Sequence, residues 1–62
     1  MDDLERYEKM LRELSLPDLR AKHAEAHELA STMRSWSPYY PMARRMEDRA
    51  RRVLAERVTE QQ

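Results

Sequence analysis

The sequence predicts an all-α fold: an antiparallel helical hairpin over about 17–34 and 38–58, with a shorter N-terminal helix over about 2–14. Three observations lead to this prediction. Glycine is absent, which disfavours β structure because the tight turns of β-hairpins require positive φ. Apolar residues recur at alternating spacings of three and four, as on one side of a helix. A single interior stretch with two prolines, 34–41, separates the two longest of these patterns.

The N-terminal helix is predicted by one apolar stripe and by its charges. The stripe steps by three, four and three residues and consists of Leu4, Tyr7, Leu11 and Leu14. Acids precede bases by four residues in the pairs Asp2/Arg6, Glu5/Lys9 and Glu8/Arg12, each of which adds about 0.3 kcal/mol to a helix. Pro17 disfavours helical geometry at Leu16, so we expect a break or sharp kink there. Ser15 and Asp18 form a variant of the capping box, which indicates that a new helix begins.

The two hairpin helices are predicted to pack along matching apolar stripes. The first stripe consists of Leu16, Leu19, His23, Ala26, Ala30 and Met33. The second consists of Tyr39, Met42, Ala43, Met46, Ala50, Val53 and Leu54. In an antiparallel arrangement alanines fall opposite methionines, so large and small side chains alternate across the seam. We therefore expect Ala26 and Ala50 to be buried at close helix contacts and Tyr39 to close the seam at the turn.

The turn between the hairpin helices contains three of the four aromatic residues, Trp36, Tyr39 and Tyr40. Pro38 and Pro41 end the arriving helix, and they suit the first turn of the next helix, where a missing N–H costs little. Ser37 directly before Pro38 is typical of an N-cap. This stretch is therefore predicted to be the tip of the hairpin.

Residues 1–62 are predicted to form one domain, with a polar tail that frays from about 59. A chain of this length buries only about 60% of its unfolded surface, so its stability alone is marginal. No cysteine is present to form a disulfide or a thiolate metal site. We therefore expect a homo-oligomer, in the simplest case a dimer. Two arrangements remain open, because the N-terminal helix can dock on its own hairpin in a three-helix bundle or on a partner's hairpin in a dimeric bundle.

Charge and hydropathy argue against several partners. Twelve basic residues balance twelve acidic ones, so no net field attracts nucleic acid or membranes. No apolar run approaches the roughly 20 residues of a membrane span. Met1 is followed by Asp2 and Asp3, the reverse of the basic start of a secretory signal. The expected compartment is the cytoplasm.

No catalytic or cofactor site is predicted. His23 and His27 lie one helical turn apart, but no cysteine or third histidine completes a structural zinc site. We expect His23 at the edge of the seam and His27 on its solvent side; the alternative is a weak metal site assembled across a dimer. The serines fit caps, turns and helix surface, and the chain has no glycine-rich loop for phosphates. We therefore expect neither an enzyme nor a metal or cofactor.

An alternative function follows from the basic third helix. Arg45, Arg49 and Arg52 share one side of that helix and could contact phosphates. Three acid–base pairs within the same helix oppose this interpretation, namely Arg44/Asp48, Glu47/Arg51 and Arg52/Glu56. The acidic first half and basic second half of the chain can equally orient two copies in a dimer.

The tip provides the leading functional candidate. Exposed Trp, Tyr and Arg side chains dominate protein–protein hot spots, and Trp36, Tyr40 and Arg34 occur together here. We expect these three to face outward while Tyr39 seals the hairpin. The simpler interpretation is that all the aromatics only plug the hairpin end. The sequence therefore favours a non-catalytic protein–protein interaction module, a small regulator or inhibitor that binds a larger protein. The alternatives are a nucleic-acid-associated regulator and a structural assembly subunit of a virion or scaffold.

Overall fold

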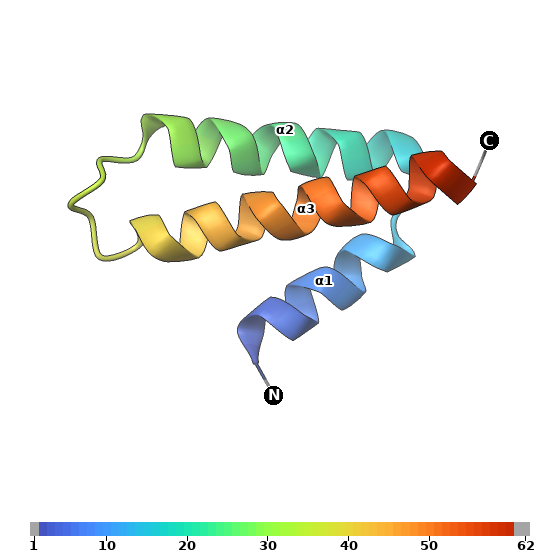
Figure 1. Ribbon diagram of the computed structural model, residues 1–62, viewed down its shortest axis with the longest axis horizontal. Helices are drawn as coiled ribbons and strands as arrows, with labels where there is room; N and C mark the ends of the chain where they lie inside the picture. The colour runs from blue at the N-terminus through green and yellow to red at the C-terminus, as the bar shows by residue number, and fades with distance from the viewer. Residues whose placement is uncertain (1, 61–62) are drawn as a thin grey trace.

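The computed structural model describes residues 2–60 and contains three helices: α1 (Asp3–Glu13), α2 (Leu16–Thr32) and α3 (Tyr40–Glu60). Helices α2 and α3 lie side by side and antiparallel, and α1 packs at an oblique angle, mainly against α3 (Figure 1). The molecule measures 39 × 26 × 15 Å. The predicted all-α hairpin with a shorter N-terminal helix is confirmed.

Helix α1 begins as its charges predict. Asp2 is the N-cap, and its carboxylate accepts a hydrogen bond from the amide of Leu4 at 3.1 Å. Of the three predicted acid–base pairs, only Glu8 and Arg12 are recorded as an ion pair, at 3.6 Å. The other two pairs involve exposed side chains, for which such contacts contribute little.

The predicted break lies between Glu13 and Leu16. Leu14 and Ser15 both have extended backbone, and α2 then starts with Pro17 in its first turn. The Ser15 carbonyl accepts from the amide of Leu19 at 2.8 Å, but the Ser15 side chain makes no capping bond. The predicted capping box is therefore wrong, and the start of α2 depends on backbone geometry and the fixed φ of Pro17.

The core lies at the end of the hairpin away from the turn. Leu11 of α1, Leu19 of α2 and Ala50 and Val53 of α3 are fully buried in one cluster. Half-buried side chains pack around it, namely Tyr7, Met10, Leu14 and Leu54. Because Leu11 belongs to this cluster, α1 docks on its own chain, and the monomer is a three-helix bundle.

Polar contacts also fasten α1 to α3. The Arg57 guanidinium donates hydrogen bonds to the carbonyls of Arg12 and Leu14, two groups that the end of α1 leaves without helical partners. Arg12 pairs with Glu56 at 2.8 Å, and Arg49 lies 3.7 Å from Glu8. Glu56 was predicted to pair with Arg52, but α1 supplies its partner instead. These contacts place α1 beside the C-terminal half of α3.

The seam between α2 and α3 closes on small residues. Ala26, Ala30, Ala43 and Ala50 are all buried, as predicted for close helix contacts at Ala26 and Ala50. His23 is half-buried at the edge of the seam. The seam does not close at the tip, where Met42 remains 39% exposed.

Tyr39 was predicted to be a core residue, and this is wrong because its side chain is 72% exposed. The prediction extended the helical register of the third helix back to residue 39, whereas α3 begins at Tyr40. Helix α2 also ends at Thr32, so no helical turn of α2 lies opposite Tyr39.

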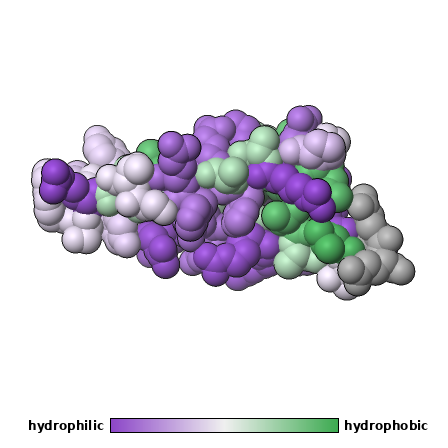
Figure 2. Space-filling model, turned by 90° about the horizontal axis from the view of Figure 1, so that it is seen from above, coloured by the Kyte–Doolittle hydropathy of each residue, from purple (hydrophilic) through white to green (hydrophobic). Residues whose placement is uncertain are grey.

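Helix α3 continues through Thr59 and Glu60, two residues beyond the predicted end at 58. The remainder of the tail predicted to fray, 61–62, lies outside the described residues. Hydrophobic residues gather at the end of the molecule where α2 begins and α3 ends (Figure 2). Within residues 2–60, none of the helices combines the length and the hydropathy that crossing a membrane requires.

Candidate functional site

The hairpin tip, residues 33–39, is an ordered turn. The amide of Ser37 donates to the carbonyl of Arg34 at 2.9 Å, and the amide of Tyr40 donates to the carbonyl of Ser37 at 3.1 Å. The Ser37 hydroxyl accepts from the amide of Tyr39 at 3.2 Å. Ser37 thus uses its hydroxyl as predicted, although the amide it binds lies just before α3 rather than in its first turn.

Two aromatic side chains project from this turn. Trp36 is 78% exposed and Arg34 is exposed, as a partner-binding tip requires. Tyr39 is also exposed, whereas Tyr40 is only half-buried against the hairpin. The predicted roles of the two tyrosines are therefore largely exchanged: Tyr39 faces outward and Tyr40 is the more sheltered ring.

The tip half of the molecule also carries the remaining exposed large apolar side chains. Leu29 in α2 is 44% exposed and Met42 in α3 is 39% exposed. Among the described residues, every exposed large hydrophobic or aromatic side chain thus lies between residues 29 and 42. In the space-filling view the tip end is pale, distinct from the strongly hydrophilic middle of the molecule (Figure 2). The tip is consequently an amphipathic surface and not a solvated loop of small polar residues.

The tip half is basic. Residues 29–46 contain three bases, Arg34, Arg44 and Arg45, and no acid. Arg44 lies 3.7 Å from Glu47, so part of its charge is compensated. Arg34 and Arg45 are exposed and take part in no ion pair recorded for residues 2–60. Together with Trp36 and Tyr39, they give the tip the side-chain types that dominate protein hot spots.

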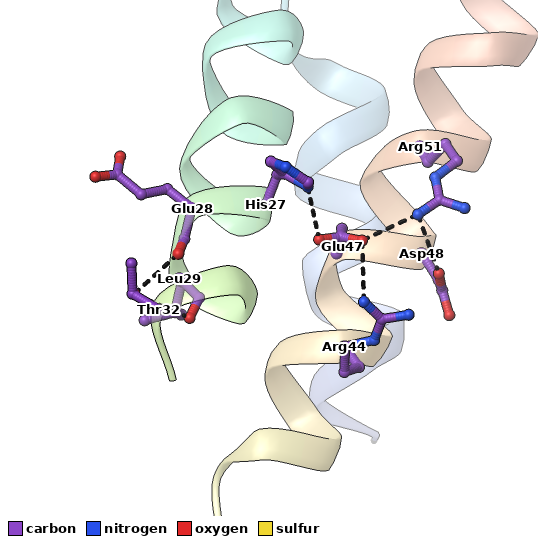
Figure 3. A network of polar contacts seen from close by, with 8 residues as sticks. All are labelled: His27, Glu28, Leu29, Thr32, Arg44, Glu47, Asp48 and Arg51. Atoms are coloured by element: carbon purple, nitrogen blue, oxygen red, sulfur yellow. Dashed lines mark hydrogen bonds and ion pairs between the residues drawn. The ribbon is translucent and has the colours of Figure 1, made fainter. Parts of the chain in front are cut away.

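A buried carboxylate ties together the two helices that carry the tip. Glu47 of α3 is 2% exposed, the one charged residue buried within residues 2–60. Its carboxylate lies 3.1 Å from Nδ1 of His27 and accepts from Arg51 at 3.0 Å (Figure 3). Because a carboxylate accepts, Nδ1 of His27 carries the hydrogen. Glu47 thus links α2 to α3 across the seam.

Electrostatics at Glu47 favour the ionised form. Burial alone would raise the pKa of Glu47, but the hydrogen bond from His27 and the charges of His27, Arg44 and Arg51 outweigh it and lower the pKa.

The sequence predicted the Glu47/Arg51 pair but not the burial of the Glu47 side chain. The signal was present, since Glu47 lies four residues after Ala43 and three before Ala50, on the seam side of α3. The predicted Arg44/Asp48 pair is replaced by Arg44–Glu47 and Arg51–Asp48, each at 3.7 Å.

A small hollow of about 170 Å³ lies where the three helices meet. It is lined by Tyr7, Met10, Lys22, Glu25, Ala26, Leu29 and Met46. Burial raises the pKa of Tyr7, and the charge of Glu25 raises it further. Leu29 belongs both to this hollow and to the exposed apolar surface of the tip half. The apolar surface therefore extends from the tip to α1.

The two histidines, His23 and His27, lie one helical turn apart on α2. His27 uses Nδ1 to bind Glu47, and its side chain is 65% exposed on the solvent side of the seam, as expected. Within residues 2–60, no cluster of three or more His, Cys, Asp or Glu side chains is arranged to hold a metal ion.

The arginine stripe of the alternative function lies on α3. Arg45 and Arg52 are exposed, but Arg49 between them is directed to Glu8 of α1. The Arg12–Glu56 ion pair adds a second acid where α1 meets α3. Acidic side chains thus interrupt the basic surface that phosphates would contact. Comparisons of the chain with protein-family models, with curated proteins and with solved structures find no match.

Proposed function

We propose that this chain is a non-catalytic protein–protein interaction module, a small regulator or inhibitor that binds a larger protein through the hairpin tip. The contact residues are Arg34, Trp36 and Tyr39, with the half-buried Tyr40 at the edge of the contact. The observation that carries the proposal is the 78% exposure of Trp36 on a turn that its own hydrogen bonds hold in place.

Energetics support this assignment. A tryptophan or tyrosine ring buries about 150–250 Å² in a contact and can contribute 2 kcal/mol or more to binding. An ordered turn loses less conformational entropy on binding than a flexible loop. The Glu47 contacts fix α2 against α3 near the tip, so the two ends of the turn are also held. The tip is therefore pre-organised for contact with a partner.

The polar groups of the chain support a non-catalytic role. The hydroxyls of Thr32 and Thr59 donate to backbone carbonyls one helical turn earlier, and the Ser37 hydroxyl accepts from a backbone amide. These hydroxyls serve the local backbone rather than a nucleophile–base pair. His27, one of the two histidines, is engaged with Glu47.

The test compares Trp36→Ala and Tyr39→Ala with Lys9→Ala, an exposed control on α1. A partner is first captured from the native host with the unchanged protein and identified by mass spectrometry, and its affinity is then measured by calorimetry. We expect each tip variant to bind about 30-fold more weakly or worse, equivalent to about 2 kcal/mol. The thermal melt should remain within a degree or two of the unchanged protein, because neither ring is in the core.

Tryptophan fluorescence provides an independent check in dilute solution. An exposed Trp36 should emit at long wavelength and be quenched by iodide. Emission at short wavelength that iodide does not quench, from a demonstrated monomer, would show that Trp36 is buried and would refute the tip as the binding site. Tip variants that bind the partner as tightly as Lys9→Ala would refute it as well.

A further inference from the structure

The charges of the chain are separated between two surfaces. The start of α1 carries three acids, Asp2, Asp3 and Glu5, with no base before Arg6. Residues 29–46, around the tip, carry three bases and no acid, and one of these bases, Arg44, is paired with Glu47 just outside this range. Asp3 and Glu5 are exposed and, like Arg34 and Arg45, take part in no ion pair recorded for residues 2–60. Each molecule thus presents an acidic surface at the start of α1 and a basic surface at the tip.

The two surfaces do not meet within one chain. Helix α1 runs in the same direction as α3, with Glu8 beside Arg49 and Arg12 beside Glu56. It consequently starts near the middle of α3 and ends near its C-terminal end, and its N-terminus lies well away from the tip (Figure 1). The start of α1 points toward the tip half of the hairpin but does not cover it.

We propose that a second copy of this chain covers the tip half, in an antiparallel dimer with two-fold symmetry. In this arrangement the basic tip of each copy lies against the acidic start of α1 of the other, and the contact occurs twice. Arg34 and Arg45 of one copy face Asp3 and Glu5 of its partner. The dimer is a closed assembly of two copies, as most homodimers are, because both copies use the same surface.

The apolar surface of the tip half supplies the centre of the interface. Leu29 and Met42 lie on the two hairpin helices, and Trp36 and Tyr39 extend the surface around the turn. Helix α1 covers only part of the hairpin's length, so two antiparallel copies can place each tip half beside the other's α1. Four exposed apolar side chains form this centre, so the interface is small beside specific interfaces, which bury about 1,200–2,000 Å² in total. We therefore expect a weak dimer that depends on concentration.

The inference concerns the same tip as the proposed function and gives it a form of regulation. A dimer buries Trp36 and Tyr39, so self-association competes with the binding of a larger partner. At low concentration the tip is free to bind the larger partner, and at high concentration the dimer buries it. A monomer at all concentrations would overturn this inference and would leave the Trp36 partner-binding test unaffected.

The experiment is a charge swap followed by sedimentation equilibrium from micromolar to millimolar concentration. One variant carries Arg34→Glu and Arg45→Glu, and the other carries Asp3→Arg and Glu5→Arg. Each variant alone places like charges at both contacts, so we expect association at least tenfold weaker than that of the unchanged protein. An equimolar mixture restores opposite charges at both contacts and should recover a particle of twice the monomer mass.

The matched control reverses two charges outside the interface, Arg20→Glu and Arg52→Glu, and should associate like the unchanged protein. Circular-dichroism melts show that each variant is folded before its mass is measured by sedimentation equilibrium. A mixture that associates no better than its components would overturn the proposal, as would an unchanged protein that remains monomeric at millimolar concentration. Particles larger than two copies would indicate open head-to-tail association and would overturn the two-fold arrangement.

Discussion

Replacing Glu47 with glutamine tests the polar link between α2 and α3. The substitution keeps the size of the side chain and removes its charge. The carboxylate accepts from His27 at 3.1 Å and from Arg51 at 3.0 Å, and Arg44 lies 3.7 Å away. A hydrogen bond to a charged group contributes about 1.5–3 kcal/mol, whereas exposed ion pairs contribute about 0.2–1 kcal/mol. The three partner side chains are 51–65% exposed, so the lower values apply.

We expect Glu47→Gln to lower the free energy of unfolding at neutral pH by about 1–2 kcal/mol. The glutamine oxygen still accepts one bond, but its NH₂ group faces arginine and histidine donors without an acceptor. In a domain of this size the loss corresponds to a melting temperature about 5–15 °C lower. The measurement is thermal and urea unfolding followed by circular dichroism at 222 nm.

The pH dependence of this difference gives a second, sharper readout. The pKa of Glu47 is lowered in the folded protein, so the folded state binds fewer protons than the unfolded state between the two pKa values. The stabilisation is therefore complete above the unfolded value of about 4.3 and is lost as the pH falls through the folded value. The unchanged protein and Glu47→Gln should differ most near neutral pH and converge in acid, where protonated glutamate resembles glutamine.

The matched control is Asp48→Asn, which removes one charge from an exposed neighbour in contact with Arg51 alone. We expect it to change the free energy of unfolding by less than about 0.5 kcal/mol. If Glu47→Gln is no more destabilising than Asp48→Asn, or if its effect persists unchanged at low pH, the buried carboxylate does not hold the hairpin helices together.

Two further expectations follow from the seam and from α3. Ala26→Glu places an unpaired charge in the buried contact between α2 and α3 and should lower the free energy of unfolding by several kcal/mol. The control, Ala24→Glu on the exposed side of α2, should leave the thermal melt nearly unchanged. Equal melts of the two variants would show that the seam is misplaced. Nucleic-acid binding should be weak and should vanish near physiological salt concentration, because acidic side chains interrupt the arginine stripe. Gel shifts that persist at this salt concentration, and that weaken in the double variant Arg45→Ala/Arg52→Ala, would instead favour the nucleic-acid function.

Local rules were sufficient to predict the helices. The break at Pro17 and the turn at Pro38 and Pro41 depend on steric restrictions within one or two residues, so the sequence alone indicates them. The burial of Ala26 and Ala50 followed from periodicity, which needs only the assumption that the two helices pack in antiparallel register. The break, the turn and the packing of α2 against α3 account for most of the fold.

Features that depend on where a helix begins, or on a partner distant in sequence, were harder to predict. Tyr39 was assigned to the core because the helical register was extended one residue too far. Glu47 was predicted only as the ion-pair partner of Arg51, although its spacing from two buried alanines marked it as a seam residue. Whether α1 docks on its own chain depends on contacts such as Arg57 with Arg12, 45 residues apart. No local pattern contains that information.

The exposed tip was predictable in part. The turn residues and the presence of Trp36 in a sharp connection indicated an outward aromatic, and Trp36 is indeed exposed. The division between Tyr39 and Tyr40 was not predictable, because adjacent residues point in different directions and a shift of one residue in the helix start exchanges them.

The position of α1 has a consequence for the order in which the chain folds. Helices α2 and α3 are separated only by a short turn. In contrast, α1 contacts residues 49–57 of the same chain, and the two hydrogen bonds that Arg57 makes join residues 45 and 43 positions apart in the sequence. Closing the larger loop costs more chain entropy, and a helix of 11 residues is marginal in isolation. The hairpin should therefore form first, and α1 should become helical only as it docks. During synthesis, the apolar side of α1 emerges long before its binding surface exists, and it stays without a partner until Arg57 has been added to the chain.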